Sequence, residues 1–507
     1  MAPRALGRTR YPHAGRASAR PVLPGEASGP ALRLATLVAV VTAIFPAFVT
    51  GAVPAEASAP ARAAPRPNVV LVVTDDQRWD SLSGMPTLTT ELGEQGVTFT
   101  NAFTVNPQCC PSRASLLTGR YSHSTGVYAN SGPHGGFRAF DDSTTLATAL
   151  DEVGYTTGLF GKYLNGYGGR KAAGYVPPGW DVWSVFHGGS DGYYDYRLAR
   201  QHRLTSYGRS PDHYSTAVLA RQAASFVRNA REPFFLELAP YAPHAPALTP
   251  PGRAQTFEDS PWSTPVSFDE RDVSDKPAHI RRLRALSAQD IRDAERFRRR
   301  QLLASLGVDD ALRLVLDELG ARGLVESTVF VYTSDNGVAW GEHLLAAGRK
   351  AVPYEEQIRV PLVVRYDPLT RAAPRTDGHL VLNVDIAPTL ARLAGARLPG
   401  TEGRNLLRLL RRREPVAWRS DFLVEHLAGG AAWDVPTYCA VRNGRYKYVL
   451  YETREEELYD LVRDPHELQN LAGAANVRAL QRRLLARLGA LCRPAPPGFG
   501  AVAALRG

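Results

Sequence analysis

The residues best suited to chemistry in this chain form one turn, Cys109-Cys110-Pro111-Ser112-Arg113, which leads into the apolar segment 114–118. Proline favours the first turn of a helix, where its missing N–H group is not needed. Free N–H groups and the helix dipole at such a start attract anions, and Arg113 adds a fixed positive charge. The turn is therefore expected to hold a negatively charged group beside a sulfur-derived group. Two buried thiols, or a disulfide between Cys109 and Cys110, are the alternatives.

Pairs of polar residues follow two apolar runs that lie far apart in the sequence. The runs, Asn68–Thr74 and Thr328–Ser334, are short and rich in β-branched residues, as in strands buried on both faces of a parallel sheet. Asp75-Asp76 follows the first run and Asp335-Asn336 the second. Because the carboxyl ends of parallel strands share one edge of the sheet, these four side chains are expected to converge there.

Three carboxylates and one amide oxygen form a cage suited to a hard cation, Ca²⁺ or alternatively Mg²⁺. One acidic pair at a strand end would more simply be solvated or cap the next helix. Two matched pairs beside the cysteine turn favour a metal instead. The sequence has no Cys/His cluster with the spacing of a zinc site. The turn and the acidic pairs therefore predict one site around a divalent ion.

The elements that position these residues follow from apolar periodicity. Strands and helices alternate up to about residue 417, which predicts an α/β fold with a large, mainly parallel sheet flanked by helices. The helix over residues 288–322 is expected to break near Gly307, and Gly166–Tyr196, rich in Gly, Tyr and Trp, is expected to be a long ordered loop. After Trp418, short strands around the Asn443-Gly444 turn and a following helix predict a small antiparallel sheet with one helix.

The expected organisation along the chain is a signal peptide at residues 1–59, a linker at 60–67, a catalytic domain at 68–417 and a C-terminal subdomain at 418–507. The apolar run Leu34–Val49 follows an arginine-bearing start and precedes small residues, a pattern typical of secretion. An uncleaved membrane anchor is the alternative, although Pro46 interrupts a run that is already short for a span. Secretion favours a disulfide between Cys439 and Cys492, with two separate thiols as the alternative.

Composition excludes other classes of protein. Net charge is +10 over 507 residues, and six Arg against two Glu lie in the first 60. This modest excess is compatible with acidic substrates, but no Lys/Arg stripe interleaved with aromatic residues indicates nucleic-acid binding. Apolar residues make up 44% and charged residues 22% of the chain, as in folded soluble proteins. Neither a nucleic acid nor a stable membrane partner is expected.

The cysteine turn, continued by Leu116-Leu117-Thr118-Gly119-Arg120, resembles the signature of the type I sulfatases. Val73–Gln77 and Thr333–Gly337 resemble the metal-ligand motifs of that family, and the resemblance extends from Asn68 to about Pro497. It implies the alkaline-phosphatase-like sulfatase fold and the oxidation of Cys109 to formylglycine by a formylglycine-generating enzyme. The hydrated aldehyde would be the nucleophile, neutralised by Arg113. The implied Ca²⁺ ligands are Asp75, Asp76, Asp335, Asn336 and the modified Cys109.

Three further residues match positions of the sulfatase family. Lys162, in Gly-Lys-Tyr-Leu-Asn, corresponds to a sulfate-binding lysine, and His244, in Ala-Pro-His-Ala-Pro, to the histidine that meets the leaving-group oxygen. Lys350 corresponds to a second sulfate-binding lysine, with Arg349 as the alternative because an extra residue changes the spacing. Many sulfatases have a histidine where this chain has Leu164. Its role in breaking down the sulfated intermediate is expected to pass to Asn165 or water, or to be dispensed with.

Several stretches resemble one subgroup, the N-acetylglucosamine-6-sulfatases and extracellular heparan endosulfatases. These are the double cysteine, Lys162–Asn165, Val176–Trp180, Gly192–Tyr196 and Trp418–His426. The resemblance implies hydrolysis of the 6-O-sulfate of N-acetylglucosamine or of a related sulfated glycan. A phosphoester or phosphonate monoester hydrolase on the same fold is the nearest alternative. A non-catalytic secreted glycan-binding protein is another, but the presence of every expected ligand and of the nucleophile argues against it.

Overall fold

The computed structural model describes residues 66–168, 174–188, 192–257, 262–372, 374–411, 416–429 and 434–500. The expected signal peptide and residues 60–65 of the expected linker lie outside these ranges. Among the described residues, no helix combines the length and the apolar composition that crossing a membrane requires.

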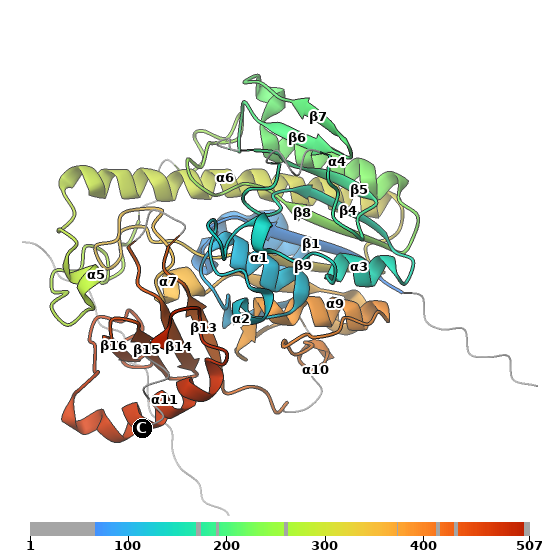
Figure 1. The fold of residues 1–507 in the computed structure, drawn as a ribbon. Coiled ribbons are helices and arrows are strands. Elements are labelled where there is room, and N and C mark those ends of the chain that lie inside the picture. Colours follow the sequence, from blue (N-terminus) through green and yellow to red (C-terminus); the bar gives the residue numbers. More distant parts are fainter. Residues whose placement is uncertain are drawn as a thin grey trace, which may run out of the picture. The chain divides into compact units, whose positions relative to one another are not determined.

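A mixed sheet of ten strands forms the centre of the fold, in the order β11-β2-β10-β9-β1-β8-β4-β5-β6-β7 (Figure 1). The five strands from β9 to β5 in this order are parallel, and antiparallel neighbours flank them on both sides. β1, β8 and β9 are buried along their whole length, as the apolar runs predict. The strands are β1 (Asn68–Thr74), β2 (Val97–Phe99), β4 (Thr156–Gly161), β5 (Val182–Phe186), β6 (Arg197–Arg200), β7 (Arg203–Ser206), β8 (Phe234–Ala239), β9 (Thr328–Ser334), β10 (Leu362–Arg365) and β11 (Arg375–Asp377), with a separate pair β3 (Ala102–Phe103) and β12 (Val381–Leu382).

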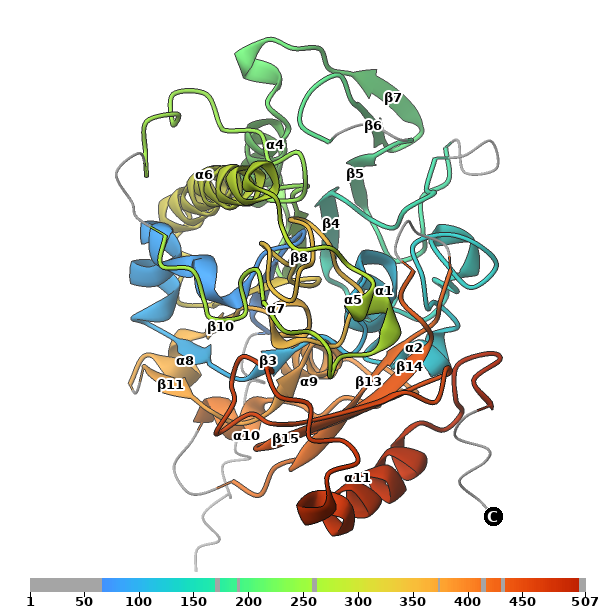
Figure 2. The same ribbon diagram turned by 90° about the vertical axis from the view of Figure 1, so that its left-hand side faces the viewer.

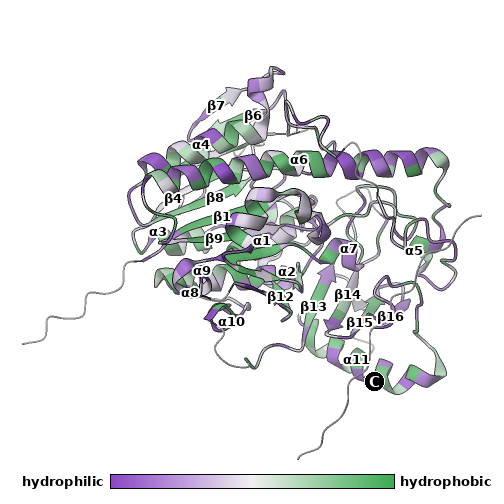
Figure 3. Cartoon of the chain, turned by 180° about the vertical axis from the view of Figure 1, so that it is seen from behind, coloured by the Kyte–Doolittle hydropathy of each residue, from purple (hydrophilic) through white to green (hydrophobic). Residues whose placement is uncertain are grey.

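Helices cover both faces of the large sheet. α4 and α6 pack on the face that carries Val70 and Val72, whereas α1, α3 and α9 pack on the face of Val69 and Leu71 (Figure 1). Alternate residues of β1 thus enter two separate cores, as expected for a strand covered on both sides. Figure 3 shows hydrophobic central strands and a long α6 on which hydrophobic and hydrophilic residues alternate. The helices are α1 (Cys109–Thr118), α2 (Ser122–Thr125), α3 (Leu146–Asp151), α4 (Ser215–Asn229), α5 (Ala278–Arg281), α6 (Ala288–Ala321), α7 (Glu355–Ile358), α8 (Asp367–Thr370), α9 (Ile386–Ala394) and α10 (Leu407–Arg411).

Two expectations about individual elements are wrong. Val182–Phe186, within the stretch expected to be a loop, forms β5 and pairs in parallel with β4. α6 continues through Gly307, where a break was expected. A Cβ atom at position 307 would lie 3.0 Å from Pro250 Cγ. The glycine therefore permits close packing of α6 against a neighbouring loop and does not end the helix.

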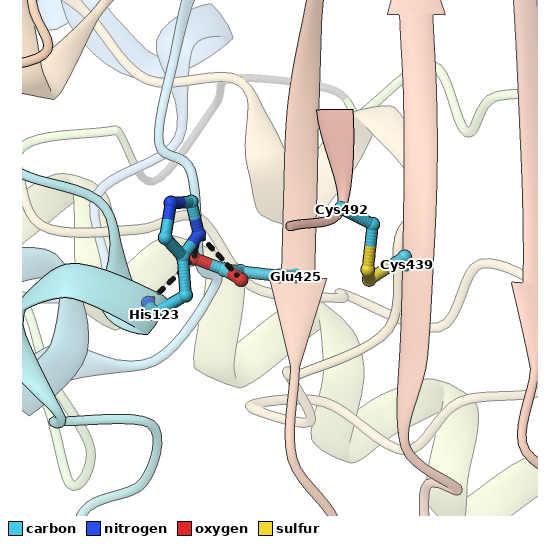
Figure 4. The surroundings of a disulfide bond; sticks show 4 residues. All are labelled: His123, Glu425, Cys439 and Cys492. Atoms are coloured by element: carbon cyan, nitrogen blue, oxygen red, sulfur yellow. Dashed lines mark hydrogen bonds and ion pairs between the residues drawn. A yellow bond between two sulfur atoms is a disulfide. The ribbon is translucent and has the colours of Figure 1, made fainter. Parts of the chain in front are cut away.

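The C-terminal residues form a four-stranded antiparallel sheet in the order β13-β14-β15-β16. One face packs on the rest of the fold and the other on α11 (Figure 2), and both sheets belong to one compact unit. A disulfide joins Cys439 of β14 to Cys492, which follows α11 (Figure 4). This is the pairing that the sequence favoured. The elements are β13 (Asp421–His426), β14 (Tyr438–Asn443), β15 (Tyr446–Tyr451), β16 (Glu456–Asp460) and α11 (Arg478–Leu491).

Candidate active site

The four candidate metal ligands lie at adjacent strand ends. β1 and β9 pair in parallel up to their last residues, Thr74 and Ser334. Asp75-Asp76 and Asp335-Asn336 therefore leave the sheet side by side, and all four side chains are buried. The Asp76 N–H donates to Asp335 Oδ1 (3.1 Å), and the Asn336 amide donates to Asp76 Oδ1 (2.6 Å). The fold thus brings together residues that are far apart in the sequence.

Cys109 is the first residue of α1, and its sulfur faces these carboxylates. Sγ lies 3.4 Å from Asp75 Oδ1 and 4.0 Å from Asp76 Oδ1. Cys109 and Cys110 are both buried free thiols, so they do not form the disulfide considered as an alternative. The Cys110 sulfur accepts a hydrogen bond from the Asn165 N–H (3.0 Å). The helix start therefore presents Cys109, and not Cys110, to the acidic cluster.

Two lysines reach the cluster from different loops. Lys162, directly after β4, pairs with Asp75 Oδ2, and Lys350, in the loop before α7, pairs with Asp76 Oδ1. Lys350 also donates to Cys109 Sγ (2.9 Å). Each lysine side chain is only 8% exposed. Both expected sulfate-binding lysines therefore reach the acidic cluster, and Lys350, which the sequence favoured over Arg349, also contacts the sulfur.

Arg113 ties the start of α1 to the strand ends. Its Nε donates to Asp335 Oδ2 (2.9 Å) and its Nη1 to the Lys162 carbonyl (3.2 Å). Its Nη2 lies 3.9 Å from Asp75 Oδ2. One guanidinium thus fixes three chain segments around the cysteine, as its planar set of donors allows.

His244 lies at the rim of the cluster, in the loop after β8. Its side chain is 25% exposed, and Nε2 lies 3.5 Å from Asp76 Oδ2. Nδ1 donates to the Ala245 carbonyl (2.7 Å), because a carbonyl oxygen can only accept. The Tyr241 ring packs against the imidazole at a centroid distance of 4.7 Å. These contacts hold Nε2 toward the cluster.

Burial and neighbouring basic groups set the protonation states of the cluster. Burial alone would raise the pKa of Asp75, but Lys162, His244 and Arg113 outweigh it and lower the pKa to about 2. For Cys109 burial dominates and raises the pKa of the thiol, despite the two lysines. Burial acts to lower the pKa of Lys162, but the negative charge of Asp75 outweighs burial, so the pKa is raised. The unmodified thiol is therefore neutral and a poor nucleophile.

The donor set fits a hard cation. One ligand atom from each of Asp75, Asp76, Cys109 and His244 lies within 4.8 Å of the others, in a search of the described residues. Asn336 Oδ1 is buried without a hydrogen-bond partner in the described part of the chain. Asp335 is not part of this group; its Oδ1 accepts from the N–H groups of Asp76 and Asn336, and its Oδ2 accepts from Arg113 Nε. Oxygen donors of this kind suit Ca²⁺ or Mg²⁺.

Sequence patterns did not indicate Gln301 of α6, which supports the cluster from behind. Its Nε2 donates to the carbonyls of Asp76 (3.1 Å) and Pro243 (3.2 Å). The one available signal was a glutamine on the apolar face of an amphipathic helix. Leu164, in contrast, packs in the hydrophobic core, so that position supplies no polar side chain.

The sequence model of the sulfatase family matches residues 67–396. The chain belongs to the sulfatase family. A second model, of the C-terminal region of N-sulphoglucosamine sulphohydrolase, matches residues 341–493. Sulfatases are sulfuric ester hydrolases, and a cluster of buried carboxylates, lysines and a cysteine at one sheet edge is consistent with that chemistry.

Named sulfatases are similar to this one over most of its length. N-acetylglucosamine-6-sulfatase of Homo sapiens is 32% identical over 453 residues, which cover 80% of this chain and 81% of that protein. The extracellular sulfatase SULF-1 homolog of Drosophila melanogaster is 34% identical over 377 residues. That match covers 71% of this chain but only 33% of the Drosophila protein.

Solved structures share the fold of this sulfatase. A protein in complex with its substrate D-glucosamine-2-N,6-O-disulfate superposes with a TM-score of 0.73 at 24% identity, over 84% of this chain and 98% of that one. The phosphonate monoester hydrolase of Agrobacterium radiobacter superposes with a TM-score of 0.69, also at 24% identity, over 85% and 96%. The fold alone therefore accommodates both sulfur and phosphorus esters.

Proposed function

We propose that this sulfatase removes the 6-O-sulfate of N-acetylglucosamine, or of a related amino sugar in a glycosaminoglycan. The observation that carries the proposal is the convergence of Lys162, Lys350 and His244 on the carboxylates beside Cys109, with Lys350 also at its sulfur. The oxygens of a sulfate ester repel an anionic nucleophile unless cations offset their charge. The likeness to N-acetylglucosamine-6-sulfatases over about four fifths of both chains supports this choice of sugar.

We assign a divalent cation, Ca²⁺ or alternatively Mg²⁺, to Asp75, Asp76, Asp335 and Asn336, together with the modified residue 109. The buried amide oxygen of Asn336, which has no donor among the described residues, supports this assignment. When bound, such an ion offsets negative charge on the sulfate and favours a deprotonated hydroxyl.

We further propose that a formylglycine-generating enzyme oxidises Cys109 before the protein acts. The neutral buried thiol supports this step, because it is a weak nucleophile as it stands. The hydrated aldehyde supplies two hydroxyl groups, one to attack sulfur and one to expel sulfate afterwards. An unmodified Ser or Cys has no second hydroxyl for that release.

The side chains around residue 109 have separate roles in the proposed reaction. Lys162 and Lys350 offer their ammonium groups to the sulfate oxygens, where negative charge accumulates. Arg113 stays on Asp335 and holds the start of α1 in place. His244, the partly exposed residue at the rim, donates a proton from Nε2 to the leaving sugar oxygen. Leu164 lies in the core, so we assign no proton transfer to that position.

We place the mature enzyme outside the cell, after removal of a signal peptide at residues 1–59. The Cys439–Cys492 disulfide supports an oxidising compartment. Relatives that are named extracellular sulfatases support the same location.

The test is sulfate release from N-acetylglucosamine 6-sulfate, beside an aryl sulfate and an aryl phosphate. Wild-type protein, produced together with a formylglycine-generating enzyme, is compared with Cys109→Ala. We expect the wild type alone to release sulfate, with the amino sugar as the better substrate. Faster hydrolysis of the aryl phosphate would instead support a phosphoester hydrolase, and sugar binding without turnover a glycan-binding protein.

A further inference from the structure

A cleft of about 430 Å³ opens near the acidic cluster and has no role in the reaction proposed above. We name it the tryptophan cleft and define it by Arg78, Trp79, Trp262, Trp340, Glu356 and Arg359, which all line it. Its volume lies in the usual range of small-ligand pockets.

The tryptophan cleft lies on the same edge of the sheet as the active site. Arg78 follows Asp76 by two residues, just beyond the carboxyl end of β1. Trp340 Nε1 donates to Gln301 Oε1 (2.5 Å), and the same glutamine donates to the Asp76 carbonyl. Arg359 precedes β10, which runs antiparallel to β9 and therefore begins at this edge. The tryptophan cleft and the acidic cluster are therefore neighbours at this edge and share the contacts of Gln301.

The walls of the cleft combine indole rings with fixed guanidinium groups. Trp79 and Trp262 are half-buried, whereas Trp340 is only 4% exposed. Arg78 lies over Trp340 at 4.1 Å from the ring centroid, and Arg359 lies over Trp79 at 4.9 Å. Such stacking holds the planar donors in place. A pyranose ring, with C–H groups on its faces and hydroxyls around its rim, matches walls of this kind.

Arg359 is the cation in the cleft that lacks a carboxylate partner. Arg78 and Arg442 are paired with carboxylates, but Arg359 forms no ion pair with any acidic residue in the described ranges. It donates to the Thr100 carbonyl instead, and burial lowers its pKa. This guanidinium is suited to an anionic group of a ligand, a sulfate or a carboxylate.

Glu356 carries a polar atom of the cleft that has no partner among the described residues. It is 5% exposed, and its Oε2 has no hydrogen-bond partner among the described residues. Burial and the neighbouring Glu342 raise its pKa to about 8, so at neutral pH the carboxylic acid can both donate and accept. Buried polar groups are normally satisfied, and a sugar hydroxyl would satisfy this one.

We propose that the tryptophan cleft binds a second, anionic sugar unit of the glycan whose sulfate the active site removes. This inference rests on the proposed function and narrows it, because the preferred substrate becomes an oligosaccharide. One sugar lies at Cys109, and another places its anionic group on Arg359 and a hydroxyl on Glu356.

The test compares a short substrate with a long one. N-acetylglucosamine 6-sulfate and a heparan-type tetrasaccharide with the same terminal residue are given to wild type, Arg359→Gln and Trp262→Leu. Arg371→Gln, an exposed arginine outside the cleft, is the matched control. We expect Arg359→Gln to raise the KM for the tetrasaccharide about tenfold, as for the loss of one charged hydrogen bond. Trp262→Leu should also raise this KM, because the sugar ring loses an aromatic wall, and both variants should leave the monosaccharide kinetics unchanged.

Equal losses on both substrates would mean that these residues support the fold or the active site, and no loss on either would mean that the cleft binds no sugar. Both results overturn the inference. Failure of the wild type to release sulfate from either substrate would contradict the proposed function instead. In that case, calorimetry with the tetrasaccharide still tests the cleft: binding should weaken in Arg359→Gln, and equal binding to both proteins overturns the inference.

Discussion

At the ends of β1 and β9, each buried carboxylate of the site has a basic side chain in contact with it. Asp75, Asp76 and Asp335 are fully or almost fully buried, and Lys162, Lys350 and Arg113 contact them directly. Such a balance stabilises each charged group, because an unpaired buried charge is very costly. The arrangement also places two ammonium groups beside residue 109, where they can bind the oxygens of a sulfate.

Removal of the divalent ion tests the assignment of Asn336. We expect a chelator to abolish sulfate release and lower the thermal unfolding midpoint, and Ca²⁺ to restore both, since a ligand of the native state stabilises it. Asn336→Leu removes the partnerless amide oxygen and should need more Ca²⁺ for half-maximal activity. Asn229→Leu, an exposed amide at the end of α4, is the control. If Asn336→Leu and wild type need the same Ca²⁺ concentration for half-maximal activity, Asn336 does not bind the ion.

Replacement of either lysine tests the electrostatic role. Lys162→Met and Lys350→Met should each lower kcat/KM for the sulfate ester by about 10²–10³, the usual cost of losing one donor to developing charge. Arg203→Met, at an exposed basic residue of β7, should leave kcat/KM unchanged. Steady-state kinetics and thermal unfolding are measured together. A variant that stays folded and fully active would show that its lysine does not contact the sulfate.

Sequence reasoning predicted the strand-end residues better than the loop residues. Asp75, Asp76 and Asp335 could be placed together because parallel strands expose their carboxyl ends at one edge. The sequence favoured Lys350 but left Arg349 as the alternative, since neighbouring residues in a loop point in directions that only the folded path determines. Gln301 was missed because its contacts with the Asp76 and Pro243 carbonyls and with the Trp340 side chain leave no pattern in the sequence.

At the scale of elements, α2 is attached to the C-terminal sheet through one histidine. His123 Nδ1 contacts both carboxylate oxygens of Glu425 on β13, at 3.0 and 3.1 Å (Figure 4). Its Nε2 lies 3.3 Å from Glu402 Oε1. Burial alone would lower the pKa of His123, but the hydrogen bonds to Glu402 and Glu425 raise it to about 9.

This raised pKa predicts a pH-dependent stability. The folded-state pKa is above the ordinary value of about 6.5, so the stabilisation is complete below pH 6.5 and is lost as pH rises through about 9. The free energy of unfolding should therefore fall between pH 6.5 and 9 more steeply in wild type than in His123→Gln. Denaturant unfolding at several pH values measures both slopes. Parallel curves for the two proteins would contradict the assignment.

Elements with a clear apolar pattern could be predicted, and those with mixed composition could not. Asn68–Thr74 and Thr328–Ser334 are strands over the expected residues. β5 was missed because its five residues stand between segments rich in Gly, Tyr and Pro, which are typical of loops. The helix break at Gly307 was wrongly expected, because local propensity gives way to packing against Pro250.

At the scale of the molecule, buried ion pairs join the small sheet to the part that carries the site. Lys447 of β15, with a side chain 0% exposed, lies 3.4 Å from Glu355 Oε1 of α7 and 2.5 Å from Glu467 Oε1. The next residues of α7 contact the ligand loop, where the Gly337 N–H donates to the Gln357 carbonyl (3.0 Å). The C-terminal sheet thus supports α7, and α7 supports the loop with Asp335 and Asn336.

Lys447→Met tests this connection. It leaves Glu467 without its cation and Glu355 with Arg442 alone, which should lower the free energy of unfolding by about 3–5 kcal/mol. Adding Glu467→Gln removes the carboxylate that Lys447→Met leaves unpaired and should recover part of the loss. Denaturant unfolding measures all three proteins. A loss below 1 kcal/mol, the usual limit for an exposed pair, would show that the two parts are not held together in this way.

The central claim is that Cys109, at the meeting point of the acidic pairs and the lysines, becomes the nucleophile of a sulfatase by oxidation. Peptide mass spectrometry of active enzyme tests it directly, because conversion to formylglycine removes one sulfur and two hydrogens and adds one oxygen. We predict that the peptide with residue 109 carries this change in a fraction that rises in proportion to specific activity. Fully active enzyme with an intact Cys109 thiol would contradict the account.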